Sequence, residues 1–368
     1  MHVRDVEFII VGAGIMGVAT AFFLSESKRE VLLIDRKGVG EEASGRNAGS
    51  LSLQNKPYQL IPLCREGIRT WRELDQEIGG LGFVQPGGFR VAETEEEYFF
   101  LAKDLKERNR YGLGIVQMPI EEVRRIAPYV SDSLKGANYC LWDGYVDARV
   151  ATQRIALAAR SRGVEIVTNN AVIKIKWKNR SCIFVITEKQ QYRCHRLLIA
   201  AGVWTRQLGR FLDLDLPLNL RINQMVVTSR YPRLIEHMIT HARGHLTLKQ
   251  LDCGSILIGG GWPGAGDLSQ DIKRPRYESI VGNVAVAVRV VPELAPIEAI
   301  RTWAGFDGRT NDELPILGPV PEKGNVFLAT GCFGGYVAGP YIGKLMAQMM
   351  IGQKPEMSID AFSVRRFS

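Results

Sequence analysis

The stretch VEFIIVGAGIMG, residues 6–17, decides the fold, because an apolar strand runs directly into a glycine-rich turn. A helical run follows over residues 18–25, and a second apolar strand over residues 31–34 ends on Asp35. Asp35 can accept a hydrogen bond from a ribose hydroxyl. Strand, turn, helix, strand and acid in this order form a complete βαβ fingerprint for a dinucleotide cofactor.

The residues of the turn have separate roles in such a fingerprint. Gly12 allows the tight turn, Gly14 lets the backbone approach a pyrophosphate, and Gly17 permits close packing of the helix on the strand. The first helical turn, with Ile15 and Met16, offers amide donors and a positive dipole end to the phosphates. The sequence therefore predicts that the pyrophosphate binds at this helix start.

Length and composition describe an ordinary globular enzyme. The chain has 368 residues, 46% hydrophobic and 23% charged, and this length favours two domains. Six cysteines are scattered without a CxxC pair, so we expect reduced thiols and neither disulfides nor a metal site. No apolar run is long enough to span a membrane and no signal peptide precedes the first strand, so we expect a cytoplasmic location.

The net charge of +8 is spread along the chain, with only short basic clusters such as residues 108–110. Nucleic-acid binding needs a concentrated basic face, so we expect no nucleic-acid partner. A basic surface that docks an acidic partner subunit stays open as an alternative.

A second motif, SGRNAGS over residues 44–50, begins about ten residues after Asp35, one short loop away. Its small residues allow a close approach of the backbone, and Arg46 and Asn47 suit polar cofactor atoms. In a nicotinamide enzyme the second strand is normally followed by another crossover, without such a glycine-rich return. The motif therefore favours a flavin dinucleotide over NAD.

Three later segments complete a set of motifs: LLIAAGVW over residues 197–204, RTWAGFDG over 301–308, and VFLATGCFGGY over 326–336. With these motifs the chain resembles the D-amino-acid-oxidase-like (DAO) family of FAD-dependent oxidoreductases. That family includes glycine oxidase, sarcosine oxidase and proline dehydrogenase subunits. The motifs occur in the family's order and span nearly the whole chain.

The resemblance implies an α/β fold: a Rossmann-like FAD-binding domain of the glutathione-reductase/DAO type, with an inserted, mixed-sheet α+β substrate domain. The FAD-binding domain is expected to be discontinuous, over residues 1–57, 140–212 and 319–368. The substrate-binding domain is expected over residues 58–139 and 213–318.

The resemblance also implies which residues contact FAD. They come from the fingerprint, the second motif, the adenine-contacting strand near residue 172 and the two glycine-rich returns. The predicted set is Gly12, Gly14, Ile15, Met16, Gly17, Asp35, Arg36, Ser44, Arg46, Asn47, Ala48, Gly49, Val172, Ala201, Gly202, Trp204, Gly331, Gly334, Gly335, Tyr336 and Val337.

The reaction implied by the resemblance is oxidation of an amine, in which a C–H bond next to nitrogen gives a hydride to flavin N5 and an imine forms. In glycine oxidase an Arg after Trp-Ala-Gly clamps the substrate carboxylate, whereas here that place holds Asp307. An acid there resembles the flavin subunits of sarcosine, proline, hydroxyproline and opine dehydrogenases. We therefore expect the catalytic, beta-type subunit of a heteromeric complex. Such a complex could carry a second flavin (FMN) at a subunit interface and associate peripherally with a membrane through a partner.

Candidates for the substrate site are fewer. His245 lies at an expected strand start, where it could bind a carboxylate or accept a proton, although a surface or capping histidine is the commoner explanation. Tyr336 could touch the substrate or the ring, and a core aromatic explains it nearly as well. Arg309 could replace the missing clamp, with an exposed loop arginine as the default. Lys56 could sit near the flavin, although a lone lysine is usually solvated. Cys332 could attach the flavin covalently, although most buried cysteines of this kind are structural.

Two other functions stay open. The chain could be a glycine or D-amino-acid oxidase that acts alone with oxygen. It could also carry flavin only for assembly or electron relay within a complex. An NAD-dependent dehydrogenase would leave the return over residues 331–336 unexplained.

Local patterns predict the remaining elements. Helices are expected over residues 58–74, from the N-cap Thr94 to about Arg110, and over 147–162, 274–291 and 338–350. Strands of the substrate sheet are expected over residues 220–229, 245–249 and 255–259.

Overall fold

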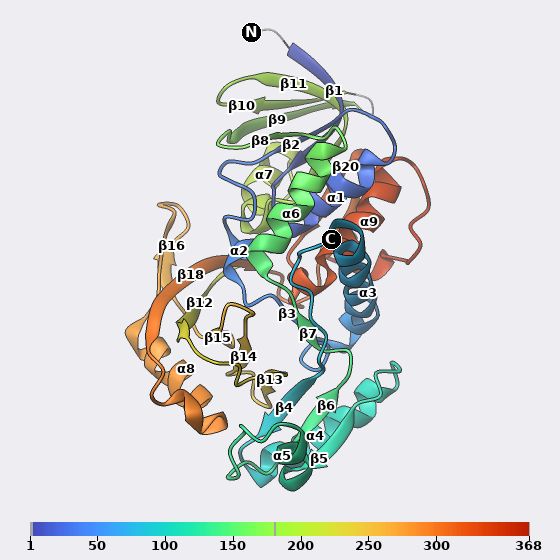
Figure 1. The fold of residues 1–368 in the computed structure, drawn as a ribbon. Helices are drawn as coiled ribbons and strands as arrows, with labels where there is room; N and C mark the ends of the chain where they lie inside the picture. Colours follow the sequence, from blue (N-terminus) through green and yellow to red (C-terminus); the bar gives the residue numbers. More distant parts are fainter. Residues whose placement is uncertain (1–2, 180–181, 368) are drawn as a thin grey trace.

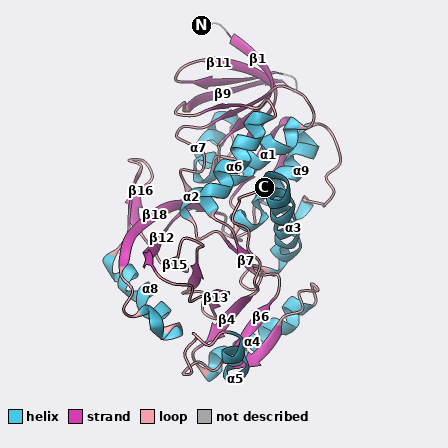
Figure 2. Ribbon diagram, in the orientation of Figure 1, coloured by secondary structure: helices cyan, strands magenta, loops and turns pink. Residues whose placement is uncertain are grey.

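The computed structural model describes residues 3–179 and 182–367, which form two large sheets with helices around them (Figure 1, Figure 2). The first sheet, at the top of Figure 1, has the order β19-β20-β11-β1-β2-β8, and β10 and β9 continue from β11. Its strands are β1 (Val3–Val11), β2 (Val31–Ile34), β8 (Glu165–Val167), β9 (Val172–Asn179), β10 (Cys182–Thr187), β11 (Gln191–Ile199), β19 (Ile316–Val320) and β20 (Lys323–Thr330).

The centre of this sheet is parallel and covered on both faces. Strands β8, β2, β1, β11 and β20 run parallel to their neighbours, which explains why their sequences are continuous apolar runs. One face packs on helices, and the other is closed by β9, β10 and a short helix. The helices are α1 (Ile15–Ser25), α3 (Ile61–Ile78), α6 (Ala148–Ser161) and α9 (Gly335–Met350) on the first face, and α7 (Thr205–Gly209) on the second.

The second sheet, lower in Figure 1, has the order β18-β12-β15-β14-β13-β4-β6-β5 and is mostly antiparallel. It has its own apolar core, to which α8 contributes. Its strands are β4 (Gly88–Ala92), β5 (Val116–Pro119), β6 (Gly136–Cys140), β12 (Asn219–Arg230), β13 (Met238–His241), β14 (Thr247–Gln250), β15 (Ser255–Gly259) and β18 (Ala299–Arg309), and its helices are α4 (Glu95–Asn109), α5 (Ile120–Ile126) and α8 (Tyr277–Val290).

Short elements connect the two sheets. Strand β3 pairs with β7, and β16 pairs with β17 in a hairpin that extends from the second sheet. Their bounds are α2 (Ala43–Arg46), β3 (Ser50–Leu51), β7 (Gly144–Tyr145), β16 (Ala265–Asp267) and β17 (Ile272–Arg274), with 3-10 turns at Tyr58–Leu60, Gly202–Trp204, Arg210–Leu212, Pro292–Leu294, Asp360–Phe362 and Val364–Phe367.

The predicted mixed α/β fold is confirmed, and the caps found in the sequence are present. Thr94 and Glu97 form a reciprocal capping box at the start of α4, and Asp147 accepts from the Val150 amide at the start of α6. Helix α3, within the predicted substrate segment 58–139, packs on α9 beside the first sheet. The predicted domain limits stay a prediction. Within the described ranges, no helix is long and apolar enough to cross a membrane.

Helix α9 begins at Gly335, so the predicted start at residue 338 was wrong. Pro340 inside the helix cannot donate to the carbonyl of Tyr336, four residues earlier. The indole nitrogen of Trp71 in α3 donates to that carbonyl instead, over 3.1 Å. A tertiary contact therefore satisfies the group that the proline leaves free, and the helix can start one turn before it.

Candidate functional site

A cavity of about 2060 Å³ lies between the carboxyl ends of the first-sheet strands and the second sheet. Small-molecule pockets usually measure roughly 300–1,000 Å³, so this cavity has room for an extended dinucleotide and a substrate. The predicted cofactor residues line it, except for Gly17 and Gly49, which lie behind the wall. Segments distant in the sequence thus meet at one site.

The turn after β1 is held by Asp35. The Asp35 carboxylate accepts from the Ala13 amide over 2.7 Å and from the Lys37 amide over 2.7 Å. Burial raises the pKa of Asp35, and these two backbone hydrogen bonds oppose that rise. Asp35 therefore fixes the shape of the turn from the end of β2, while it still borders the cavity.

Helix α1 begins at the cavity without a side-chain cap from its N-cap residue, Gly14. Ser44, from the second motif, accepts from the Ile15 amide over 2.9 Å. A Cβ on Gly17 would lie 1.9 Å from the Gly12 carbonyl oxygen, so helix and turn touch at that glycine. An open helix start on a cavity wall is a favourable place for a phosphate.

The second motif shapes a loop that bridges the sheets. Arg46 donates to the carbonyls of Glu41, over 2.7 Å, and Ala304 in β18, over 3.2 Å. Trp303 returns a hydrogen bond to the Arg46 carbonyl over 2.8 Å. Asn47 accepts from the Gly49 amide over 2.6 Å. Arg46 and Asn47 thus organise the loop through backbone contacts, in addition to bordering the cavity.

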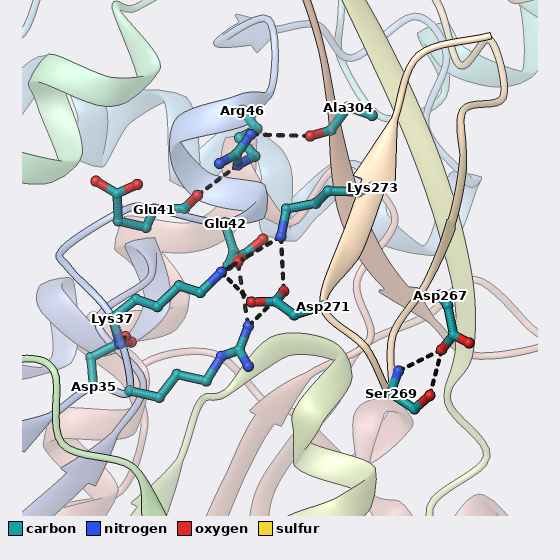
Figure 3. A network of polar contacts seen from close by, with 11 residues as sticks. Asp35, Lys37, Glu41, Glu42, Arg46, Asp267, Ser269, Asp271, Lys273 and Ala304 are labelled. Carbon is teal, nitrogen blue, oxygen red and sulfur yellow. Dashed lines mark hydrogen bonds and ion pairs between the residues drawn. The ribbon is translucent and has the colours of Figure 1, made fainter.

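Five charged side chains join the loop after β2 to the β16–β17 hairpin, and we call this group the clasp: Arg36, Lys37, Glu42, Asp271 and Lys273 (Figure 3). Glu42 accepts from Lys37 over 2.8 Å and from Lys273 over 2.9 Å. Asp271 lies 2.5 Å from the Lys37 ammonium and 3.1 Å from the Arg36 guanidinium. Although burial opposes ionisation, hydrogen bonds from Lys37 and Lys273 hold the pKa of Asp271 well below its ordinary value.

The clasp lies beside the dinucleotide side of the cavity. Arg36, Glu42 and Asp271 border the cavity from opposite sides. The Arg36 guanidinium also stacks on the ring of Trp204, 3.9 Å from its centroid, next to the predicted AAG-x-W segment. Charge pairs therefore join the hairpin to the loop after β2 across this part of the cavity.

Asp307 and Arg309, both in β18, form an ion pair at the other end of the cavity. The Arg309 Nε lies 2.8 Å from Asp307 Oδ2, and its guanidinium is also 3.6 Å from Glu313. Asn223 in β12 donates to the same Asp307 oxygen over 3.2 Å. Asp307 therefore neutralises Arg309, which lies 4.5 Å from the centroid of the Phe333 ring.

Lys56, in the segment after β3, lies against the same Phe333 ring. Its ammonium is 5.0 Å from the Phe333 centroid and 2.9 Å from the Asn55 side-chain oxygen. The residue is 7% exposed, and burial lowers the pKa of its ammonium. Lys56 therefore borders the cavity as a buried amine close to the start of α9.

Three other candidates occupy different places. His245 is exposed just before β14, outside the cavity wall, and its ring lies 5.7 Å from that of Trp262. The Tyr336 hydroxyl donates to the Ala148 carbonyl over 2.6 Å, and burial raises its pKa, so its side chain belongs to the core. Cys332 is buried on the wall, and burial raises the pKa of its thiol well above the ordinary value.

Sequence reasoning missed several polar residues near the site. Arg90 in β4 borders the cavity and pairs with Asp104 over 2.7 Å, and its Nε is buried without a hydrogen-bond partner in the described structure. Lys249 in β14 donates to the Val146 carbonyl over 2.7 Å behind Gly49, and burial lowers its pKa to about 7. The sequence signal that could have indicated them is an arginine or a lysine placed within a predicted strand.

Comparison with known proteins agrees with this geometry. The family model "DAO: FAD dependent oxidoreductase" matches residues 7–349. Hydrogen cyanide synthase subunit HcnC of Pseudomonas aeruginosa is 33% identical over 99% of this chain and 97% of its own length. Sarcosine oxidase subunit beta of Rhizobium meliloti is 24% identical over 98% and 88%. The crystal structure of glycine oxidase from Geobacillus kaustophilus superposes with a TM-score of 0.89 at 25% identity, covering 98% of both chains.

Proposed function

Because the chain belongs to the DAO family of FAD-dependent oxidoreductases, which oxidise amino acids and amines, we propose that it acts on a proline-, hydroxyproline-, sarcosine- or opine-type substrate. The observation that carries the proposal is the cavity itself. One wall has the start of α1, whose N-cap residue Gly14 supplies no side-chain cap, and the other end has the buried ammonium of Lys56, which suits a carboxylate. The acid at position 307 resembles that of the flavin subunits of sarcosine, proline, hydroxyproline and opine dehydrogenases, and this likeness supports the proposed substrate class.

The residues present fit FAD. Space for a pyrophosphate exists at Gly12 and Gly14, where the helix start is open and the backbone borders the cavity. The start of α9, at Gly334 and Gly335, also lacks a side-chain cap and borders the cavity, so it suits the polar edge of a flavin ring. When bound, the flavin supplies the hydride acceptor for oxidation at carbon.

The chain's own residues then have three tasks. They hold the substrate's anionic group, direct its C–H bond towards the flavin, and surround the amine so that it stays unprotonated. Asp307 cannot hold a carboxylate, because like charges repel and its oxygen already serves Arg309 and Asn223. This difference favours the proline, hydroxyproline, sarcosine and opine class over glycine oxidase.

The test is anaerobic bleaching of the flavin in the purified, FAD-loaded protein. We expect one cyclic or N-alkyl amino acid among sarcosine, L- and D-proline, hydroxyproline isomers, glycine and opines to bleach the visible flavin absorption about ten times faster than the others. Dithionite serves as the control that the flavin is reducible. Bleaching by glycine alone would instead favour the oxidase alternative.

We also propose that the chain is the catalytic subunit of a complex. Two relatives are themselves named as subunits, of sarcosine oxidase and of hydrogen cyanide synthase. Turnover of an amine by the isolated chain with an artificial dye would show catalysis without the partner. A reducible flavin that no amine bleaches until a partner subunit is added would favour the assembly or relay function.

The clasp leads to a prediction about cofactor retention. Asp271→Asn removes the carboxylate shared by Arg36, Lys37 and Lys273 and leaves the hairpin less firmly tied across the cavity. We expect FAD release, followed by the rise in flavin fluorescence, to be about 3- to 10-fold faster at 0.1 M salt. Raising the salt should accelerate release from the wild type towards the variant's rate, because ions screen the pairs.

Asp213→Asn is the matched control for this measurement. Asp213 and Asp271 both have a left-handed backbone, with φ of 60° and 55°, which asparagine also tolerates. Asp213 is exposed and follows the turn at Arg210–Leu212, outside the clasp. Equal release rates for the two variants would contradict a role of the clasp in holding FAD.

A further inference from the structure

We infer that the Lys56 ammonium binds the carboxylate of the substrate, in place of the clamp that position 307 does not provide. The inference rests on the proposed function, and it deepens it by naming the group that recognises the substrate. It follows from the position of Lys56, from its missing counter-charge and from the support of its loop.

The position of Lys56 is set by a glycine. Gly334, the N-cap of α9, has a φ of 70°, and a Cβ there would lie 2.4 Å from Lys56 Cε and 2.9 Å from its Nζ. The lysine side chain thus occupies the space that a side chain at residue 334 would need. The ammonium arrives on the cavity wall beside the glycine-rich return, next to the Phe333 ring.

The charges at this end of the cavity single out Lys56. Arg309 pairs with Asp307, and Arg90 pairs with Asp104 over 2.7 Å. Across residues 3–179 and 182–367, no carboxylate oxygen lies within 4.0 Å of the Lys56 ammonium, whose protein acceptor is the neutral Asn55 amide oxygen. A buried ammonium without a counter-charge is costly, and an incoming carboxylate would relieve that cost.

The loop that carries Lys56 is supported by buried polar groups. Arg108 donates to the Lys56 carbonyl and to the Leu53 carbonyl, each over 2.9 Å, and Arg90 donates to the Gln54 carbonyl over 2.7 Å. Asp143 accepts from the Leu53 amide over 2.9 Å. The backbone of Lys56 is therefore held before any ligand arrives, which lowers the entropic cost of binding.

Four titratable groups face the ammonium from the elements around it. They are Cys64 in α3, Asp143 before β7, Arg309 in β18 and Cys332 before α9. Burial raises the pKa of the Cys64 thiol to about 11 and that of the Cys332 thiol well above its ordinary value, so both stay neutral near pH 7. Burial also raises the pKa of Asp143, against the hydrogen bonds that it accepts. Lys56 is thus the group here whose lowered pKa an incoming anion would raise again.

The sign of the pH dependence follows from the lowered pKa of Lys56. Above that pKa the free protein holds a neutral amine, and the complex with a carboxylate holds an ammonium, so binding takes up one proton. Affinity for a carboxylate should therefore fall as the pH rises, by up to about tenfold per pH unit. A side chain that keeps its charge, as arginine does, should remove this slope.

The experiment uses the FAD-loaded protein and pyrrole-2-carboxylate, a planar acid that is not oxidised, with binding read from the flavin absorption spectrum. Pyrrole-2-carboxamide is the neutral control ligand. Lys56→Met should weaken carboxylate binding about 10- to 100-fold and leave carboxamide binding within about threefold. Lys56→Arg should bind the carboxylate without the pH slope. Lys354→Met, at an exposed lysine, is the control variant and should match the wild type.

FAD content and thermal stability are measured for every variant. If Lys56→Met loses FAD, Lys56→Gln and Lys56→Arg are measured in its place. The pH dependence of their carboxylate affinity then decides. Unchanged carboxylate affinity in a fully FAD-loaded Lys56→Met protein overturns the inference. A slower flavin reduction at unchanged affinity also overturns it, because the ammonium would then act on the flavin and not on the carboxylate. Carboxylate binding that needs Lys56 in a protein that oxidises no amine supports the inference and defeats the proposed function.

Discussion

Gly17→Ala is expected to weaken FAD binding about 10- to 100-fold and to yield a nearly colourless protein. The new methyl group would lie 1.9 Å from the Gly12 carbonyl oxygen, a backbone atom that cannot swing away as a side chain does. Helix α1 must move off β1, or the turn must open, and either change displaces the amides that face the phosphates. Flavin content per chain after purification, followed by titration with FAD, measures the effect.

Gly324→Ala is the matched control, because it makes the same chemical change where a Cβ would meet nothing within 4 Å. It should keep the wild-type flavin content. A yellow Gly17→Ala protein with wild-type affinity would show that α1 can retreat without cost, and that the close contact is not what shapes the phosphate site.

Asp143→Ala is expected to lower the free energy of unfolding by ~2–4 kcal/mol. The carboxylate is completely buried and accepts from Ser52 Oγ over 2.7 Å, from the Leu53 amide over 2.9 Å and from Gln54 Nε2 over 3.0 Å. Alanine leaves the Ser52 hydroxyl and the Leu53 amide buried without this acceptor, while Gln54 Nε2 keeps its hydrogen bond to the Gly88 carbonyl over 3.0 Å. Denaturant unfolding of the FAD-free protein isolates this effect from cofactor binding.

Asp252→Ala, at an exposed aspartate whose nearest cation is 3.9 Å away, is the comparison and should change stability by less than about 0.5 kcal/mol. Because Asp143 supports the loop of Lys56, its loss should also weaken carboxylate binding by the loaded protein. A variant as stable as the wild type would mean that water replaces the carboxylate at this buried position.

The fingerprint was predictable because its causes are local. An apolar strand, a glycine turn and an acid 18 residues after Gly17 specify β1, α1 and β2 without help from the rest of the chain. The capping box of Thr94 is equally local, since its partner Glu97 is three residues away. Such features leave a signature in a window of a few residues.

The missed features depend on distant partners. Glu42 and Lys273 of the clasp are 231 residues apart, and the Trp71 contact that permits an earlier start of α9 spans 265 residues. Arg90 is a buried arginine in a strand, where composition alone predicts a surface residue. His245 followed the strand pattern, yet β14 begins only at Thr247, and the histidine stays in the exposed turn before it.

The order of the first sheet has a consequence for biosynthesis. Strand β20 and helix α9, among the last elements of the chain, complete a cavity whose phosphate turn is made at residues 12–17. At roughly 5–20 residues per second, a ribosome takes roughly 15–65 s to add the residues between Gly17 and Val337. The nascent chain therefore exposes apolar strands while its cofactor site is incomplete. Full FAD binding at this site is therefore expected only after β20 and α9 have been added.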